Sequence, residues 1–296
     1  MSFSVVIVLH DSAPDLGRLL RSLESHLDVT PQLICVDSGS DDDGAGVDLA
    51  RAHGAEVVEL PDNPGFGAAN NAGVALARHD VTVLLNPDVV VLDPVALPAL
   101  VAEAAIADAL HVPRLLNADG TVQDSAHPLP GSLGQALLAV SHPPRLPRVL
   151  RDLAQPWRSG RTTEVGWAIA ACVAARTATL RGLGPFDPSA FLFFEDLDLC
   201  LRARERGVRT VLHPDLALRH TGGHSTGPAF GGEPYELLAR RRRAVVLAGM
   251  GVAAARRDDL LEALTFSTRI LAARLTGRPA DTERARLAAL RAARRG

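Results

Sequence analysis

Short apolar runs alternate with helical patterns through the first third of the chain. The runs at residues 5–9, 33–36, 55–60 and 81–85 are rich in Val, Ile and Leu and predict buried strands. Between them, residues 12–27, 47–53 and 68–78 carry apolar positions at helical spacing. Strand followed by helix, repeated three times, predicts an α/β fold with a mostly parallel sheet flanked by helices.

The pattern loosens after residue 88. Helices are predicted at residues 94–106, 176–183 and 195–206, strands at 111–116, 208–213 and 217–219, and a core segment at 165–175. Residues 117–121 predict a hairpin turn. Residues 127–161 are rich in Pro, Ser and Arg and are expected to be a flexible or irregular insert, and the glycine-rich residues 222–232 a mobile loop. The remainder is helical and rich in Arg.

Composition narrows the classes of function. With 47% apolar residues and 22% charged residues, the chain of 296 residues can bury a substantial core. A net charge of -3 gives no indication of nucleic-acid binding. All 31 basic residues are Arg, which excludes Schiff-base lysine chemistry and the P-loop lysine.

The three cysteines and the lengths of the apolar runs indicate the cellular compartment of the protein. Cys35, Cys172 and Cys200 are far apart, have no metal-binding spacing and are odd in number, which favours a reducing cytoplasm. The N-terminus has no basic region typical of a signal peptide, and no uncharged apolar run reaches the roughly 18 residues of a spanning helix. We therefore expect a cytoplasmic protein.

Polar residues follow two of the predicted strands. Asp88 ends the segment Asn86-Pro87-Asp88 after residues 81–85, where a carboxylate at the sheet edge is suited to a divalent cation and a phosphate. Asp37, with Ser38 and Ser40 close behind, can accept hydrogen bonds from a nucleobase or ribose. The alternatives are an ordinary β-turn at residues 86–88 and an Asp cap at residue 37.

A glycine-containing loop precedes the third helix. In Asn63-Pro64-Gly65-Phe66-Gly67, glycines let the backbone approach a ligand, and the helix N-terminus favours phosphate. Asn70 occupies the third glycine position of a dinucleotide fingerprint, and the loop follows the third strand. A Rossmann dehydrogenase is therefore poorly supported, and a flexible loop is the alternative.

Two later segments offer acid-base and metal-binding groups. Glu195 and Asp196 open a helix directly after Phe193 and Phe194, and an apolar setting disfavours a charged carboxylate, which suits a general base. Acids in a first helical turn are also favoured by the helix dipole alone. His220 and His224 can complete a cation site or contact a diphosphate, or can be isolated exposed residues.

The order of these motifs resembles the family 2 glycosyltransferases, which have the GT-A fold and use nucleotide-diphosphate sugars. The matching segments are residues 5–8, 36–40, 63–67 with Asn70-Asn71, 85–88 and 193–199. More narrowly, the chain is similar to the rhamnosyltransferase branch in Asn86-Pro87-Asp88, in the Asp119-Gly120 hairpin followed by Gln123 and Ser125, and in His220 with His224-Ser225-Thr226.

The resemblance implies a role for each matching residue. Asp37 contacts the nucleobase near Ser38 and Ser40. The nucleotide-sugar site is lined by Asn63, Gly65, Gly67, Asn70 and Asn86, and Trp167 lies by the sugar and acceptor. Mg²⁺ or Mn²⁺ is bound by Asp88 and by His220, with His224 as the alternative. Asp196 is the general base, assisted by Glu195.

The resemblance also implies the domain organisation. Residues 1–230 form the GT-A glycosyltransferase domain, divided into a nucleotide-sugar-binding half (1–110) and an acceptor and catalytic half (111–230). Beyond the resemblance, the helical, Arg-rich pattern of residues 231–296 predicts a helical region that lies on an anionic membrane at the inner face, or is solvated, or makes a homodimer contact.

The implied activity is inverting, metal-dependent transfer of a sugar, L-rhamnose from dTDP-L-rhamnose, to a hydroxyl of a glycan, a lipid-linked glycan or a small molecule. The alternatives are a UDP-sugar-dependent enzyme of the same fold and a nucleotide-sugar-binding protein without turnover. A sugar nucleotidyltransferase is disfavoured, because residues 10–14 supply neither a glycine-rich loop nor a basic catalytic residue. Two positions depart from the family pattern: His10-Asp11 after the first strand, and Asn86 where a second carboxylate is more common.

Overall fold

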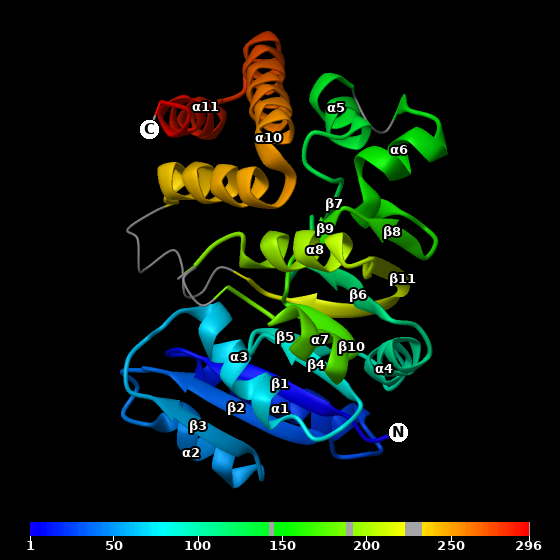
Figure 1. Cartoon of the computed structure of the whole chain (residues 1–296), viewed down its shortest axis with the longest axis vertical. Coiled ribbons are helices and arrows are strands. Elements are labelled where there is room, and N and C mark those ends of the chain that lie inside the picture. Colours follow the sequence, from blue (N-terminus) through cyan, green and yellow to red (C-terminus); the bar gives the residue numbers. More distant parts are fainter. Residues whose placement is uncertain (142–144, 188–191, 223–232, 296) are drawn as a thin grey trace.

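The computed structural model describes residues 1–141, 145–187, 192–222 and 233–295 (Figure 1). Within them, one large sheet has the strand order β3-β2-β1-β4-β10-β6-β11-β5, with β8 also paired to β11. Its strands are β1 (Ser4–Leu9), β2 (Gln32–Ser38), β3 (Glu56–Leu60), β4 (Val81–Leu85), β5 (Val89–Val91), β6 (Ala109–Leu116), β8 (Thr163–Val165), β10 (Cys172–Arg176) and β11 (Arg209–His220). A separate pair joins β7 (Ala126–His127) to β9 (Trp167–Ala168).

The strands that carry the predicted site run in one direction. β1 is parallel to β2 and β4, and β2 is parallel to β3. β10 is antiparallel to both β4 and β6, so β6 and its parallel partner β11 run with β4. The carboxyl ends of β1, β2, β3, β4 and β11 therefore lie at the same edge of the sheet.

Alternating side chains of the central strands bury both faces of the sheet. Val5, Ile7 and Leu9 pack with α1 (Ala13–His26) and α4 (Ala96–Ile106), and α2 (Ala45–Ala52) covers the same face. Val6 and Val8 pack on the opposite face with α3 (Phe66–Leu76), α7 (Thr177–Leu183) and α8 (Glu195–Glu205). Because side chains alternate across a strand, the continuous apolar runs predict this two-sided burial.

The α3 helix approaches the sheet closely at Gly73. A Cβ added to Gly73 would lie 2.3 Å from Cγ1 of Val6 and 3.2 Å from Cγ2 of Val36. Glycine is therefore required at this position by packing rather than by its backbone angles.

Replacing Gly73 with Ala is expected to lower the free energy of unfolding by about 1–3 kcal/mol, because the methyl group overpacks the contact with β1. The matched control is Gly182→Ala in α7, where an added Cβ meets no atom within 4 Å. That variant is expected to be stabilised by about 0.5–1 kcal/mol, since Gly is the poorer helix former. Urea denaturation of both variants measures the difference, and equal stabilities would contradict the packing argument.

Most of the predicted elements are confirmed, usually within two residues of the expected bounds. The hairpin turn at residues 117–121 is also confirmed, with the Asn117 N–H donating to the Thr121 carbonyl at 2.8 Å. All three cysteines are buried free thiols.

Two sequence predictions are wrong. Residues 127–161 are not an irregular insert, because they contain α5 (Leu133–Val140), α6 (Arg148–Ala154) and the short 3-10 helix Pro156–Arg158. These helices are too short to show a clear period, and α5 is fixed by packing on α10 (Tyr235–Thr276). The strands expected at residues 208–213 and 217–219 are one strand, β11, whose register shifts between His213 and Ala217. Pro214 lies in that shift and has no N–H for the ladder.

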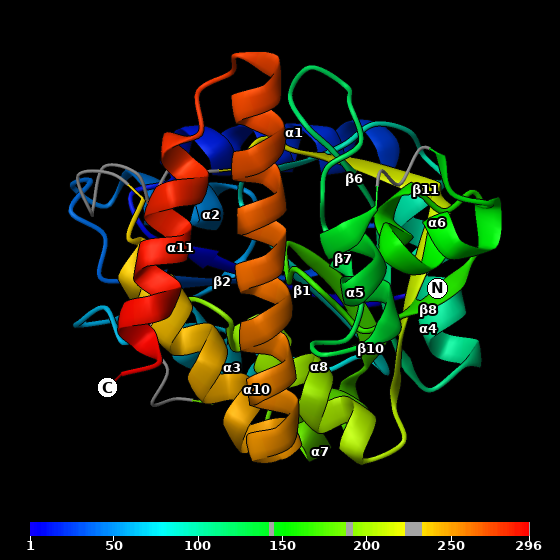
Figure 2. The ribbon, with the colours of Figure 1, turned by 90° about the horizontal axis from the view of Figure 1, so that it is seen from above.

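The C-terminal region is helical, as predicted. Figure 1 shows that the two halves of α10 run in different directions, and the bend lies at Gly251, which has φ 81°. The second half packs against α5 and against α11 (Asp281–Ala293), as the view in Figure 2 also shows. His224, nearly all of the expected mobile loop and the expected domain boundary at residue 230 lie outside the described residues.

Candidate active site

The loops after β1, β2 and β3 are joined into one polar surface at the carboxyl edge of the sheet. The Ser38 hydroxyl donates to Oδ1 of Asn63 at 3.0 Å, and Nδ1 of His10 lies 3.0 Å from the Ser38 carbonyl. The Ser40 hydroxyl accepts from the Asp11 N–H at 3.0 Å. His10 and Asp11, where the sequence departs from the family pattern, thus hold the loops that carry the predicted nucleotide-binding residues.

Asp37 is nearly buried at the end of β2. Its carboxylate accepts from the Ser40 hydroxyl and from the Ser40 N–H at 3.3 Å. These contacts fix the carboxylate against the following turn. Asp37 does not cap a helix, because α2 begins after Gly44. Its carboxylate caps the turn instead and still lies at the edge where ligands of α/β sheets bind.

The glycine-containing loop fixes the start of α3. Oδ1 of Asn63 accepts from the Gly65 N–H at 3.0 Å, and Gly65 has φ 96°. Gly67 packs on Phe186, whose Cβ would lie 2.8 Å from an added Cβ. Asn70 is buried one turn farther along, and its amide donates to the Phe66 carbonyl at 2.9 Å.

Asn71 makes a contact that sequence reasoning missed. Its side-chain oxygen accepts from the Phe186 N–H at 3.0 Å, and its nitrogen donates to the Phe186 carbonyl at 2.8 Å. The two residues are 115 positions apart, so no local pattern indicates the pair. The clasp ties α3 to the segment that leads toward α8.

Asp88 and His220 are brought together as predicted. Nε2 of His220 lies 3.3 Å from Oδ1 of Asp88, and their side chains are 11% and 15% exposed, respectively. The β5–β11 ladder sets this geometry, since it pairs Val89 with His220. The Thr221 N–H donates to the Asp88 carbonyl at 3.1 Å, and the Gly222 N–H donates to Oδ2 of Asp88 at 3.0 Å.

The remaining oxygen of Asp88 faces His220. Oδ1 is buried, and apart from its ion-pair contact with Nε2 of His220 it accepts no hydrogen bond from the described residues. Nδ1 of His220 lies 2.9 Å from Oε1 of Gln123. The Gln123 contact orients the imidazole so that Nε2 points at Oδ1 of Asp88. A divalent cation would replace a proton between these two atoms and be held by both of them.

The charge state of Asp88 is also suited to a cation. Burial acts to raise the pKa of the Asp88 carboxyl, but the contacts with His220 and the Gly222 N–H outweigh it and hold the pKa below its usual range. The carboxylate is therefore ionised at neutral pH. Asn86 lies at the start of the same turn, where its N–H donates to the Ala171 carbonyl at 2.9 Å and its carbonyl accepts from the Val89 N–H at 3.2 Å.

Glu195 and Asp196 occupy the first turn of α8, directly after two residues with unusual backbone angles. Phe193 and Phe194 have φ of 73° and 63°. Bulky residues rarely adopt the left-handed region, and such strain is concentrated at functional sites. The turn aims the start of α8 so that Oδ1 of Asp196 accepts from the Leu197 N–H at 2.7 Å.

Burial shifts the titration of both carboxyls. It raises the pKa of Glu195 and of Asp196, and the proximity of Asp196 raises that of Glu195 further. Backbone N–H groups, including those of Leu197 and Ala170, offset part of the effect at Asp196, and Arg241 offsets part of it at Glu195. Oε2 of Glu195 is buried without a hydrogen-bond partner among the described residues. These are the conditions that tune a carboxylate toward general-base work.

Two consecutive alanines connect the cation site to the carboxyl pair. The Ala171 carbonyl accepts from the Asn86 N–H, and the Ala170 backbone N–H donates to the Asp196 carboxylate. The turn that carries Asp88 and the helix that carries Asp196 therefore contact adjacent residues of one segment. Ala170 and Ala171 therefore lie between the two charged centres.

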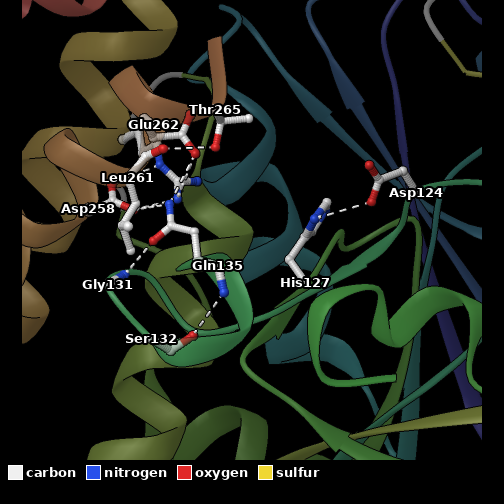
Figure 3. A network of polar contacts seen from close by, with 10 residues as sticks. Asp124, His127, Gly131, Ser132, Gln135, Asp258, Leu261, Glu262 and Thr265 are labelled. Atoms are coloured by element: carbon white, nitrogen blue, oxygen red, sulfur yellow. Dashed lines mark hydrogen bonds and ion pairs between the residues drawn. The ribbon is translucent and has the colours of Figure 1, made fainter. Parts of the chain in front are cut away.

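Trp167 belongs to an aromatic wall beside α8. Its ring is stacked on His127, with centroids 4.1 Å apart, and lies 6.1 Å from the Phe194 ring. Burial lowers the pKa of His127 to about 3, so the imidazole is neutral. Figure 3 shows Asp124 facing His127, and the two side chains approach to 3.3 Å.

A buried polar network holds the C-terminal helices against this wall. Arg242 donates to both oxygens of Asp258, at 2.7 and 2.9 Å, and its guanidinium lies 5.8 Å from the centre of the Phe194 ring. Gln135 of α5 donates to Asp258 at 2.8 Å and to Glu262 at 3.1 Å, as Figure 3 shows. Sequence analysis assigned these residues no role, because the network joins segments that are distant along the chain.

The carboxyl-edge loops, the Asp88–His220 pair and the buried carboxyls of α8 all lie in the part of the chain that matches known proteins. Residues 2–246 match the family described as "Glycosyltransferase like family 2". The chain belongs to this family. It is similar to the N-acetylglucosaminyl-diphospho-decaprenol L-rhamnosyltransferase of Mycobacterium tuberculosis, with 28% identity over 247 residues, 75% of this chain and 77% of the relative. The family assignment and the rhamnosyltransferase-like character expected from the sequence are confirmed.

A shorter stretch is similar to a second relative. The glucosyl-3-phosphoglycerate synthase of Mycolicibacterium paratuberculosis is 32% identical over 119 residues, which are 38% of this chain and 36% of that protein.

Solved structures show the GT-A fold. A mannosyltransferase from Pyrobaculum calidifontis in complex with GDP-Man and Mn²⁺ superposes with a TM-score of 0.57 and 15% identity, covering 98% of this chain and 85% of that one. Glucosyl-3-phosphoglycerate synthase from Mycobacterium tuberculosis, solved with Mn²⁺ and UDP, gives a TM-score of 0.54 and 22% identity, covering 84% and 80%. The predicted fold class is confirmed, and the chain is a glycosyltransferase.

Within the described part of the chain, no helix is both long enough and apolar enough to cross a bilayer.

Proposed function

We propose that this glycosyltransferase moves L-rhamnose from dTDP-L-rhamnose to an acceptor hydroxyl with inversion, and that it requires Mg²⁺ or Mn²⁺. The observation that carries the metal requirement is the buried Oδ1 of Asp88, which faces Nε2 of His220 at 3.3 Å and accepts no hydrogen bond from any other described residue. The choice of donor sugar rests on the similarity to the mycobacterial L-rhamnosyltransferase.

The proposed donor site follows the carboxyl edge of the sheet. Asp37 binds the nucleobase, with Ser38 and Ser40 beside it, and Asn63, Gly65, Gly67 and Asn86 line the nucleotide sugar. Asn70 supports this site by fixing the first turn of α3 through its bond to Phe66. Asp88 and His220 hold the divalent cation, which when bound stabilises negative charge on the departing diphosphate.

Asp196 is the proposed general base. Its raised pKa keeps the basicity needed to accept the proton of the acceptor hydroxyl. The hydroxyl oxygen then forms its bond to the anomeric carbon while the bond from that carbon to the diphosphate oxygen breaks. Glu195 lies beside Asp196, whose charge raises the pKa of Glu195, and Trp167 supports the Phe194 turn that aims α8.

The acceptor is proposed to be a glycan carried on a polyprenyl diphosphate, as the name of the rhamnosyltransferase relative indicates for that protein. Such a substrate places the enzyme at the inner face of the membrane in cell-wall biosynthesis.

Leu271 and Leu275 of α10 are 57% and 79% exposed and lie in an Arg-rich region, which suits peripheral contact with anionic lipid. Co-sedimentation with anionic liposomes should fall in a Leu271→Ser, Leu275→Ser variant. Unchanged membrane binding, or a dimer that this variant dissociates, would favour a protein contact instead.

A UDP-sugar donor is the alternative that a specific observation supports. The stretch of 32% identity belongs to a glucosyl-3-phosphoglycerate synthase, and the mycobacterial synthase of that name was solved with UDP. A third alternative is a nucleotide-sugar-binding protein without turnover.

A panel of nucleotide sugars tests all three. In thermal-shift assays with Mn²⁺, dTDP-L-rhamnose should raise the melting temperature more than UDP-glucose, UDP-galactose or UDP-N-acetylglucosamine. Hydrolysis or transfer of the bound sugar then distinguishes an enzyme from a binding protein. Stabilisation by a UDP-sugar alone would overturn the rhamnosyl proposal and leave the glycosyltransferase assignment intact.

A further inference from the structure

Two buried histidines face each other beneath α4, away from the proposed donor site. His111 of β6 and His213 of β11 are 2% and 6% exposed. Nδ1 of His111 lies 2.9 Å from Nε2 of His213. Glu103 of α4 completes the group, and one ligand atom from each of the three residues lies within 4.8 Å of the others.

The hydrogen bonds of His111 fix where its lone pair points. Nε2 of His111 lies 3.1 Å from the Ala107 carbonyl, which can only accept, so Nε2 carries the proton. The Nδ1 lone pair is therefore directed at His213. A backbone carbonyl that holds the outer N–H of an imidazole is the arrangement found behind metal-binding histidines.

His213 can offer a second lone pair without loss of a proton. In the metal-free state its Nε2–H donates to Nδ1 of His111. If that proton resides on Nδ1 of His213 instead, Nε2 becomes a ligand and the imidazole stays neutral. The Glu103 carboxylate supplies a negative charge, and Asp108 favours a cation near His111 while Arg209 opposes it.

We propose that Glu103, His111 and His213 form a binding site for Zn²⁺ or a similar borderline transition-metal ion. Two imidazole nitrogens and one carboxylate oxygen suit such ions better than Mg²⁺ or Mn²⁺, and a fourth position stays open to water. Tetrahedral ligation at about 2.0–2.1 Å per Zn–N bond sets the two nitrogens about 3.3 Å apart. The side chains need to separate by only a few tenths of an ångström from the observed 2.9 Å.

This site is distinct from the Asp88–His220 site. His213 and His220 lie on the same strand, but β11 bulges between them. The ladder with β6 pairs His213 with Pro113 and Arg219 with Leu116, so the two histidines are about four ladder steps apart, roughly 13 Å at about 3.3 Å per residue. The ion would join α4 to β6 and β11 and would stabilise the fold without entering the transfer reaction.

Zinc binding is tested on the full chain carrying Asp88→Ala, so that the donor site does not contribute. After removal of metal with EDTA, the protein should bind one equivalent of Zn²⁺ in calorimetric titration, and its melting temperature should rise with Zn²⁺ concentration. Co²⁺ should give the visible absorption of a tetrahedral site.

Two further variants locate the ligands. Adding His213→Gln or the exposed Glu103→Gln should each weaken Zn²⁺ binding by about tenfold or more, since even residues behind the ligands alter metal affinity by about 10–100-fold. Circular dichroism verifies that each variant is folded, and Glu103→Gln keeps the test decisive if the buried change unfolds the protein. The proposal is overturned if the double variants bind Zn²⁺ as tightly as the Asp88→Ala protein does. It is also overturned if none of these proteins binds Zn²⁺.

Discussion

Replacing Asp196 with Asn is expected to lower kcat by about 10²–10⁴-fold, the usual contribution of a general base. Asn keeps the shape of the side chain and can still accept from the Leu197 N–H, which lies 2.7 Å from Oδ1 of Asp196. It cannot take up the acceptor proton. Donor binding, measured by calorimetry in the presence of Mn²⁺, should be unchanged because the proposed donor contacts lie on the loops after β1 to β4.

The matched control is Asp198→Asn on the same helix. Asp198 forms an ion pair with Arg202 at 2.8 Å and belongs to no contact that joins the buried carboxyls to Ala170. Its substitution should leave kcat within about twofold of wild type, since an i,i+4 pair contributes only about 0.3–0.5 kcal/mol. A fully active Asp196→Asn protein would remove Asp196 as the base.

The pH dependence supplies a second readout of the same change. Burial raises the pKa of Asp196, so the base loses activity at a higher pH than an exposed carboxylate would. Below that pKa the activity of the wild type should fall about tenfold per pH unit, and the residual activity of Asp196→Asn should lack this limb. An acid limb that persists unchanged would assign it to another group, such as Glu195.

The stability of the folded protein should change with pH in the opposite direction to the activity. The folded state disfavours the charged form of Asp196, so its stabilising contribution is present below the unfolded pKa of about 3.9 and is lost as pH rises through the raised folded pKa. The Asn side chain does not ionise. The melting temperature of Asp196→Asn should therefore exceed that of wild type increasingly between acidic and neutral pH, which also verifies that the inactive variant is folded.

Replacing Asp88 with Ala is expected to weaken Mn²⁺-dependent donor binding by about 100-fold or more, since a bound cation stabilises diphosphate charge by several kcal/mol. The change removes the only carboxylate among the described residues that contacts His220. Donor binding measured in EDTA should differ little between the variant and wild type, because neither then holds the ion.

Asp80→Ala is the control for this experiment. Asp80 is an exposed residue just before β4, at the end of the strand opposite Asp88. Its backbone carbonyl accepts a hydrogen bond from the Thr177 N–H at 2.8 Å. Its removal should leave metal-dependent binding intact. Equal Mn²⁺ dependence in Asp88→Ala and wild type would show that the cation site lies elsewhere.

Local patterns in the sequence predicted the framework of the site because topology follows from them. Buried runs separated by helices require parallel strands, and parallel strands place their carboxyl ends at one edge. Asp37, Asn63 and Asp88 each follow such a run, so their common edge could be expected before any contact was known. Asp88 and His220 were paired through the family resemblance, and the β5–β11 ladder supplies the geometry.

The sequence by itself determined the α/β order, the position of each motif at a strand or helix end, and the apolar residues that precede Asp196. Tertiary structure alone decided the orientation of His220 through Gln123, the clasp of Asn71 on Phe186 and the link through Ala170 and Ala171. It also decided that residues 127–161 contain helices and that His111 meets His213. Periodicity reports which face of an element is buried, whereas these contacts join residues that are distant in sequence and depend on how separate elements pack together.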